Sequence, residues 1–465
     1  NIEMDLSTKI LSCPVSVYEN AFFDQGSLVA FEAMLEGFNQ LGRAQEEGFL
    51  IYTADLSSCQ IKQSVQDLLS TLTPHLEKIR VTALRKDWLF QEDRVILILN
   101  GLCWALMMER GEFLSKTQNR EAYLRAVCEE MGAGRDLESI FEPADLRQQA
   151  DSLISVVLKV MDYLRPRIDG MKIKFQNRLL SLRENPDQLV YYSEVIGELE
   201  DLERTQNKIV SCFAKLPETI GIFLTGSSAR DFTRDKFSDL DIVCVCSEIP
   251  DDFSRDRILH KLGVKSSFRF GSFEHIGMSD ADVHLVFVKK ERQEKVLEDF
   301  RSKGEESPIM DFRDEEKIRE FACCAYCLAL NKILWDPNGI LQSFKNQTHN
   351  VPPLYKQQIC AKWTPVWMRY KKEFHYAQQQ GDRLSALTAL HYCIQASLRI
   401  LLANHEIYCN PIEPKWISVE LNNLLNNKTQ RLQQSILDQV PLDVTETFLE
   451  RFKKAEYLWK ISTKR

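Results

Sequence analysis

The stretch Leu224-Thr-Gly-Ser-Ser-Ala-Arg-Asp-Phe-Thr-Arg-Asp-Lys-Phe-Ser-Asp-Leu-Asp241 joins two segments that have the composition of β-strands, residues 220–224 and 239–246. The Gly-Ser pair directly after the first segment predicts a turn. Side chains alternate between the two faces of a strand, so Asp239 and Asp241 are predicted to lie side by side on one face of a sheet.

A pair of neighbouring carboxylates gives this stretch its chemistry. Two carboxylates this close repel each other unless a cation lies between them, and Mg²⁺ is the expected cation because it prefers oxygen ligands and bridges to phosphates. Gly226 lets the backbone approach a phosphate, and Ser227 can donate to its oxygens. Asp282 opens a further predicted strand, residues 281–288, and could complete the metal site or deprotonate an acceptor hydroxyl. These parts suit in-line attack on a nucleoside triphosphate.

Gly226-Ser227, Asp239-Leu240-Asp241 and Asp282, in this order and strand context, resemble the DNA polymerase β-like nucleotidyltransferase superfamily. Within it they are similar to the antibiotic (aminoglycoside and lincosamide) nucleotidyltransferases. The resemblance implies a mixed β-sheet flanked by helices, two Mg²⁺ ions, and ATP or another nucleoside triphosphate as co-substrate. It also implies that Asp239, Asp241 and Asp282 are catalytic metal ligands, and that Gly226 and Ser227 bind the triphosphate.

Each of these residues also has a purely structural interpretation. An Asp-x-Asp pair after a turn is common on edge strands, and His284, two residues after Asp282, is more often a satisfied strand histidine than a catalytic one. Arg230 is a candidate for triphosphate binding, whereas Arg234 and Lys236 in the same connection are more typical of a solvated loop. The second Gly-Ser pair, at Gly271, is interpreted as a turn.

Helical patterns flank the predicted strands on both sides. Apolar spacing predicts helices over residues 95–108, 150–164, 189–216, 255–262, 328–334 and 384–403, and a short strand over 48–53. The Asn185-Pro186 pair marks a break. We therefore expect a mainly helical α+β protein in three parts: a helical N-terminal domain over 1–185, a nucleotidyltransferase core over 186–312 and a helical C-terminal domain over 313–465.

The flanks carry weaker resemblances. Residues 399–416 are similar to the helical domains that accompany antibiotic nucleotidyltransferases and are related to HEPN domains, which makes Lys415 a candidate for triphosphate contact. Arg399 and His405 fit the loose HEPN ribonuclease signature, although six residues along one helix do not bring them together. Residues 99–116 resemble the helical domain of streptomycin/spectinomycin adenylyltransferases, with Lys116 at the position of a nucleotide-facing lysine.

Two further groups of residues suggest roles that are more often structural. Acidic residues of the N-terminal part could present an acidic face to a cationic substrate, although such residues are usually just exposed; they are Asp87, Glu92, Glu109 and Glu112. The run Cys323-Cys-Ala-Tyr-Cys327 lacks a matching Cys/His pair at zinc spacing and is predicted to be core.

Composition narrows the function further. The chain has 465 residues, 44% hydrophobic, which excludes disorder as its main theme. A net charge of −8 argues against binding to duplex DNA. Thirteen scattered cysteines favour reduced thiols and a cytoplasmic location, the acidic first five residues do not match a signal peptide, and the most apolar run (95–108) is too short to span a membrane.

The resemblance and the carboxylates together predict a Mg²⁺-dependent enzyme that transfers a nucleoside monophosphate, AMP from ATP first, to a hydroxyl of an acceptor. A small molecule of the aminoglycoside type is the favoured acceptor. The alternatives are an adenylyltransferase that modifies protein or tRNA, a catalytically silent nucleotide-sensing or toxin–antitoxin interaction protein, and a HEPN ribonuclease.

Overall fold

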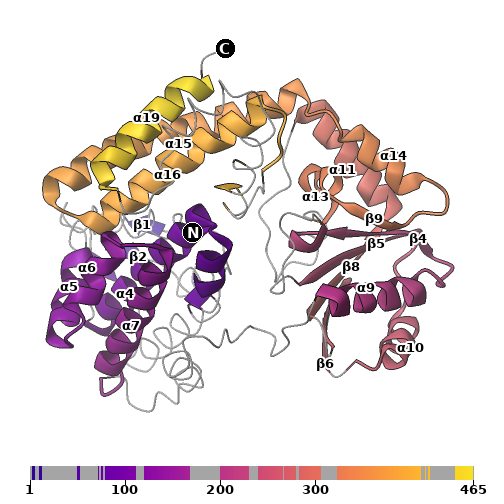
Figure 1. Cartoon of the computed structure of the whole chain (residues 1–465), viewed down its shortest axis with the longest axis horizontal. Helices are drawn as coiled ribbons and strands as arrows, with labels where there is room; N and C mark the ends of the chain where they lie inside the picture. The colour runs from indigo at the N-terminus through magenta and orange to yellow at the C-terminus, as the bar shows by residue number, and fades with distance from the viewer. Residues whose placement is uncertain are drawn as a thin grey trace. The chain divides into compact units, whose positions relative to one another are not determined.

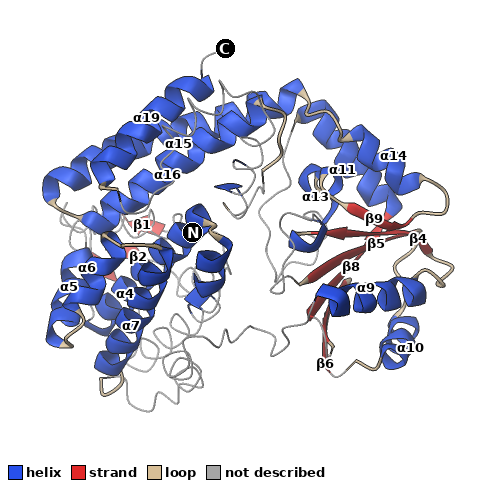
Figure 2. Cartoon of the chain, viewed as in Figure 1, coloured by secondary structure: helices blue, strands red, loops and turns tan. Residues whose placement is uncertain are grey.

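The structure is a computed structural model of the chain, mainly helical with one large sheet (Figures 1 and 2). It describes residues 3–5, 10–12, 50–52, 72, 75–76, 79–110, 120–167, 199–229, 239–264, 266–278, 282–304, 322–409, 414, 417–418, 421 and 446–463.

Two compact units divide the chain. Unit 1 comprises Asn1–Leu189, Thr364–Leu398 and Glu420–Arg465, and unit 2 comprises Val190–Trp363 and Arg399–Val419. Residues of the expected C-terminal helical domain therefore occur in both units. The division into three domains at residues 185 and 312 stays a prediction.

Unit 2 is built around a six-stranded mixed sheet with strand order β6-β7-β8-β5-β4-β9. Strands β5 and β8 run parallel to each other, and the other neighbouring pairs are antiparallel. The strands are β4 (Thr219–Thr225), β5 (Leu240–Cys246), β6 (Ser266–Phe270), β7 (Phe273–Gly277), β8 (Asp282–Lys289) and β9 (Lys332–Trp335). The expected α+β class with a mixed sheet flanked by helices is confirmed.

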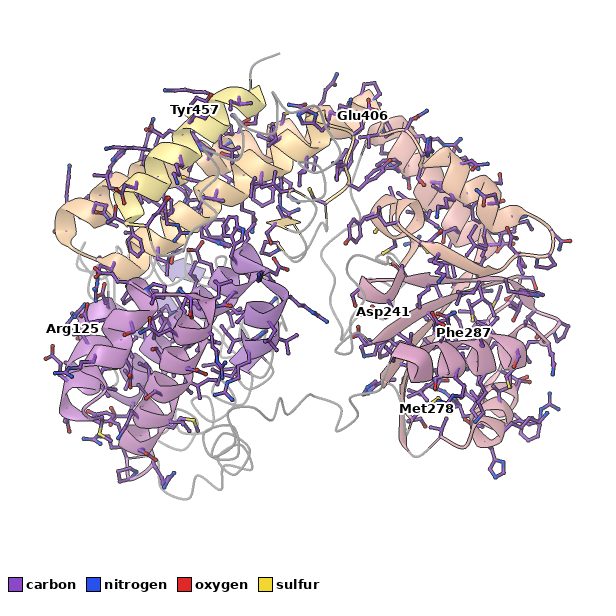
Figure 3. The ribbon with its side chains drawn as sticks, viewed as in Figure 1. Arg125, Asp241, Met278, Phe287, Glu406 and Tyr457 are labelled. Atoms are coloured by element: carbon purple, nitrogen blue, oxygen red, sulfur yellow. The ribbon has the colours of Figure 1, made fainter. Side chains whose placement is uncertain are left out.

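Helices cover both faces of this sheet. On one face, Leu240, Ile242 and Cys244 of β5 pack with helices α9 (Leu199–Phe213) and α10 (Asp252–Leu262) in a core that also holds Phe287 and Met278 (Figure 3). On the other face, Val243 and Val245 pack with helices α11 (Lys290–Lys303), α13 (Ala325–Ala329) and α14 (Ile340–Gln347). Because side chains alternate along β5, Asp241 lies on the same face as Val243 and Val245, the face covered by α11, α13 and α14. It precedes Val243, the first apolar core residue of β5 on that face, by two residues.

One segment of unit 2 contradicts the sequence pattern. The helix expected over residues 328–334 is wrong: α13 ends at Ala329, and Lys332–Trp335 forms β9, which pairs antiparallel with β4. A free strand edge on β4 supplies backbone partners that the local sequence does not reveal, and tertiary pairing outweighs local helical propensity here.

Unit 1 is a helical assembly. The expected helices over 95–108 and 150–164 are confirmed as α4 (Trp88–Arg110) and α7 (Leu146–Leu164), and the expected strand over 48–53 as β3 (Leu50–Tyr52). Strand β3 belongs to a small sheet with β1 (Glu3–Asp5) and β2 (Ile10–Ser12). Unit 1 also contains the helices α5 (Arg120–Glu130), α6 (Gly134–Phe141) and α19 (Phe448–Thr463).

Two long helices contribute residues to both units, α15 (Pro353–Gln380) and α16 (Arg383–Asn404). Helix α16 confirms the helix expected over residues 384–403. It is the one helix in the described part of the chain that is long and apolar enough to cross a bilayer, but 94% of its apolar window is buried inside the protein. Length and composition are weak evidence for a membrane span when a helix is covered to this extent.

Candidate metal centre

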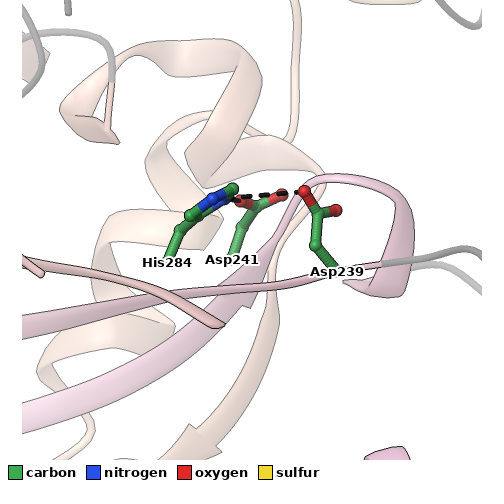
Figure 4. A group of neighbouring side chains, drawn as sticks. All are labelled: Asp239, Asp241 and His284. Carbon is green, nitrogen blue, oxygen red and sulfur yellow. Dashed lines mark hydrogen bonds and ion pairs between the residues drawn. The ribbon is translucent and has the colours of Figure 1, made fainter. Parts of the chain in front are cut away.

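Three side chains that can bind a metal meet at one end of the unit 2 sheet (Figure 4). Asp239 directly precedes β5, Asp241 is its second residue, and His284 lies on the adjacent parallel strand β8. The register of the two strands sets Asp241 opposite His284. The predicted adjacency of Asp239 and Asp241 is therefore met, and strand pairing adds an imidazole to it.

The ligand atoms of these side chains lie close together. The Nδ1 atom of His284 is 3.0 Å from Asp241 Oδ1 and 3.5 Å from Asp239 Oδ2. One ligand atom from each residue falls in a group whose members are all within 4.8 Å of one another. Each side chain is about one-third exposed, at 30% for the two aspartates and 32% for His284. The cluster is thus accessible from solvent while its backbone is fixed in the sheet.

Gly226 shapes the space beside the carboxylates. Its φ of +69° is in the left-handed region, and a Cβ atom built on it would lie 2.0 Å from Asp241 Oδ2. Ser227–Ala229 continues as a single 3₁₀ turn, in which the Ser228 hydroxyl donates to the backbone carbonyl of Asp239. The turn after β4 is therefore held against the start of β5, and Ser227 is buried within it.

We expect Gly226→Ala to damage this site more than the fold. The added methyl group must displace the Asp241 carboxylate, and alanine also resists the left-handed backbone at a cost of roughly 1–2 kcal/mol. The expected result is loss of divalent-ion binding by isothermal titration, with a thermal unfolding midpoint lowered by only a few degrees. Gly263→Ala is the matched control, since Gly263 has a φ of +70° and no heavy atom within 4 Å of an added Cβ. Equal loss of ion binding in both variants would contradict the role of Gly226.

Two rings on β7, those of Phe273 and His275, pack beside the His284 ring of the cluster. The His275 ring centroid lies 5.1 Å from that of His284, and the Phe273 centroid lies 5.8 Å from it. His275 and His284 are direct cross-strand partners. The sequence favours a structural role for His284 and gives no signal for His275, because neither the β6–β7 hairpin nor its register is visible in the local pattern.

Several predicted site residues are only partly described or lie outside the described residues. Asp282 begins β8 opposite Gly277, two positions before His284 and so on the same strand face, but the structure does not describe its side chain. Arg230, Lys415 and Lys116 lie outside the described residues. Their assignments stay predictions.

The residues of the HEPN-like signature are described. Arg399 is buried in α16 with its guanidinium 4.8 Å from the Trp363 ring centroid. His405 lies in the turn directly after that helix. A buried, ring-stacked guanidinium is typical of a packing role.

The suggested acidic face in the N-terminal part is wrong for two of its members. Asp87 and Glu92 are buried, and Glu92 is paired inside unit 1 rather than displayed to a cationic substrate. Glu112 lies outside the described residues. The cysteine run is confirmed as core, because Cys323, Cys324 and Cys327 are all buried.

The donor set fits a divalent cation. Two carboxylates and one imidazole can all coordinate such an ion, and carboxylates are the ligands that Mg²⁺ and Mn²⁺ share. The missing side chain at Gly226 leaves room for the Asp241 carboxylate, which lies where a Cβ atom would be. The geometry therefore suits an ion held at the start of β5.

Comparison with known proteins gives limited information. No protein-family model and no curated protein matches this chain. Among solved structures it is similar to a nucleotidyltransferase-like protein from Exiguobacterium sibiricum, with 17% sequence identity over 56% of this chain and 74% of that chain, and a TM-score of 0.26. A similarity at this level leaves the chain without a family assignment, so the interpretation of function depends on the site.

Proposed function

We propose that unit 2 is a divalent-cation-dependent nucleotidyltransferase that transfers a nucleoside monophosphate, AMP from ATP in the first instance, to a hydroxyl group. The observation that carries this proposal is the position of Asp239 and Asp241 at the start of β5, directly beside the Gly226-Ser227 turn that ends β4. Carboxylates that bind a cation and a turn that accommodates phosphate thus come from neighbouring strands.

Each part of the site has a role in this reaction. The acceptor hydroxyl oxygen forms a bond to the α-phosphorus, the bond from that phosphorus to the bridging oxygen breaks, and pyrophosphate leaves. The hydroxyl proton passes to a carboxylate base, for which Asp282 is our candidate. Ser227, with Arg230 and Lys415, would hold the triphosphate. A divalent cation bound by Asp239 and Asp241, or two such ions, would neutralise charge on the reacting oxygens.

The acceptor class is a further part of the proposal. We favour a hydroxyl-bearing small molecule of the aminoglycoside type over protein or tRNA. The thirteen cysteines show no spacing typical of a disulfide framework, which supports a reducing compartment such as the cytoplasm as the place of action.

Turnover with labelled nucleotide tests the proposal. The full chain is incubated with each of the four ribonucleoside triphosphates labelled at the α-phosphate, with Mg²⁺ or Mn²⁺, and with aminoglycosides, total tRNA and protein extract. We expect pyrophosphate release together with a labelled acceptor, identified by mass spectrometry, and neither product with Asp239→Asn. Nucleotide binding without transfer to any of these acceptors would contradict the proposed enzymatic activity and favour a nucleotide sensor. RNA cleavage that depends on His405 but not on Asp241 would favour the HEPN ribonuclease.

A further inference from the structure

The imidazole of His284 sets this cluster apart from a site made of carboxylates alone. Its Nδ1 atom faces both aspartates, at 3.0 Å from Asp241 and 3.5 Å from Asp239 (Figure 4). In the proposed nucleotidyl transfer, the negatively charged aspartates bind the cation, but His284 has no assigned role. The position of its Nδ1 atom beside the two carboxylates therefore needs a separate explanation.

The surroundings of His284 hold its ring towards the carboxylates. The backbone is fixed between two strands, with Asp241 opposite it on β5 and His275 opposite it on β7. The rings of His275 and Phe273 pack at 5.1 and 5.8 Å from the His284 ring. A ring whose backbone is paired on both sides and whose side packs against two other rings is pre-organised to present one nitrogen at a fixed place.

We propose that His284 is the third protein ligand of the divalent cation and that it makes the site select a transition-metal ion of the Mn²⁺ class over Mg²⁺. The catalytic role of the ion rests on the proposed function. The binding of the ion does not, because it needs no nucleotide. The neutral imidazole would offer its Nδ1 lone pair and keep its proton on Nε2.

The selectivity follows from ligand chemistry. Mg²⁺ prefers oxygen donors and releases its waters reluctantly, so a nitrogen donor adds little to its binding. First-row transition ions bind imidazole more strongly than Mg²⁺ does; Mn²⁺ gains the least of them from a nitrogen ligand, and it shares with Mg²⁺ the affinity for carboxylates. A set of two carboxylates and one imidazole therefore binds Mn²⁺ more tightly than a site of two carboxylates, while the affinity for Mg²⁺ stays nearly the same.

The competing explanation is that His284 only donates a hydrogen bond to Asp241 and positions it. His284→Asn separates the two roles, because the amide keeps a hydrogen-bond donor but lacks the imidazole lone pair. His284→Asp supplies oxygen in place of nitrogen. His260→Ala is the matched control, since His260 is an exposed histidine on α10 of the same unit.

Metal titration of the full chain without nucleotide tests the inference. Dissociation constants for Mn²⁺ and Mg²⁺ are measured by isothermal titration, and pulsed electron paramagnetic resonance detects nitrogen coupled to bound Mn²⁺. We expect the wild type and His260→Ala to bind Mn²⁺ tightly with a nitrogen signal. In His284→Asn we expect the signal to vanish and the Mn²⁺ affinity to fall roughly 10- to 100-fold, with a change in Mg²⁺ affinity of less than about threefold. In His284→Asp the preference should shift towards Mg²⁺.

An unchanged ratio of Mn²⁺ to Mg²⁺ affinity in His284→Asn, or Mn²⁺ bound by the wild type without coupled nitrogen, would overturn the inference and leave His284 as a positioning residue. Failure of the proposed function gives a different result. In that case the nitrogen-coupled Mn²⁺ would be present and no nucleotide would be transferred to any acceptor.

Discussion

Asp241→Asn is expected to lower the rate of nucleotidyl transfer by at least about a thousandfold, which corresponds to roughly 4 kcal/mol of lost transition-state stabilisation. The substitution keeps the shape of the side chain but replaces an anionic oxygen ligand with a neutral amide. Because the Asp241 side chain is about one-third exposed, its contribution to folding is small compared with its contribution to ion binding. The measurement is initial pyrophosphate release at saturating nucleotide, with circular dichroism and thermal unfolding recorded in parallel.

Asp299→Asn is the matched control for this variant. Asp299 lies on α11 of the same unit, in an i,i+4 ion pair with Lys303, so the change removes the same charge away from the cluster. We expect its rate to stay within a factor of about two of the wild type, because exposed pairs of this kind contribute little. If Asp241→Asn keeps a tenth or more of the wild-type rate while it stays folded, the cation is not held by Asp241 and the proposed mechanism fails.

The pair of aspartates could be predicted from sequence because its geometry is local. A strand period of two and the turn after residue 224 are enough to place Asp239 and Asp241 next to each other, and the observed β5 keeps that alternation. The participation of His284 depends on the parallel pairing of β5 with β8, across 43 residues of sequence. No local pattern encodes that register, so the sequence alone favours a structural role for the histidine.

The sheet edges show the same limit. The turn at Gly271 was predicted, but the strands that it joins, β6 and β7, were not, because their alternation is short and mixed. At the opposite edge, the apolar spacing of residues 328–334 predicts a helix, whereas Lys332–Trp335 forms β9. An edge strand forms where an inner strand has unpaired backbone N–H and C=O groups. The positions of those groups are known only once the inner strands of the sheet are known.

The burial of charged side chains in unit 1 also cannot be predicted from the local sequence pattern. The sequence suggests Glu92 as part of an exposed acidic face, yet Glu92 is fully buried and paired with His391 and Arg451, which lie about 300 residues or more further along the chain. A charged residue on an apolar helix is buried only when it is paired, and the sequence does not show which distant residues are its partners.

The ionic cluster of unit 1 consists of Glu92 and Asp93 on α4, His391 on α16 and Arg451 on α19. His391 lies between the two carboxylates, with Nδ1 3.2 Å from Glu92 and Nε2 3.4 Å from Asp93, and Arg451 lies 2.7 Å from Glu92. All four side chains are almost completely buried. Removal of one partner from such a cluster leaves a buried charge without compensation.

His391→Gln is therefore expected to lower the free energy of unfolding by about 3–5 kcal/mol at pH 7. The glutamine has similar size but cannot carry the positive charge that both carboxylates face. Urea unfolding, followed by circular dichroism, measures the difference, and His349→Gln, at an exposed position, is the control with no expected effect. Unfolding curves of His391→Gln that superimpose on the wild type would show that the cluster does not stabilise the fold.

The same cluster sets the sign of a pH dependence. Burial alone would lower the pKa of His391, but the hydrogen bonds and charges of Asp93 and Glu92 raise it from 6.5 to about 9. Burial would likewise raise the pKa of Glu92, but Arg451 and His391 outweigh it and hold that pKa below its usual value. Because the folded pKa of His391 exceeds the unfolded one, its stabilisation, on the order of 3 kcal/mol, is complete below pH ~6.5 and is lost as the pH rises through 9. The stability of the wild type should therefore fall between pH 7 and 10 and approach that of His391→Gln. A stability difference between the two proteins that stays constant over this range would contradict a protonated His391 in the folded chain.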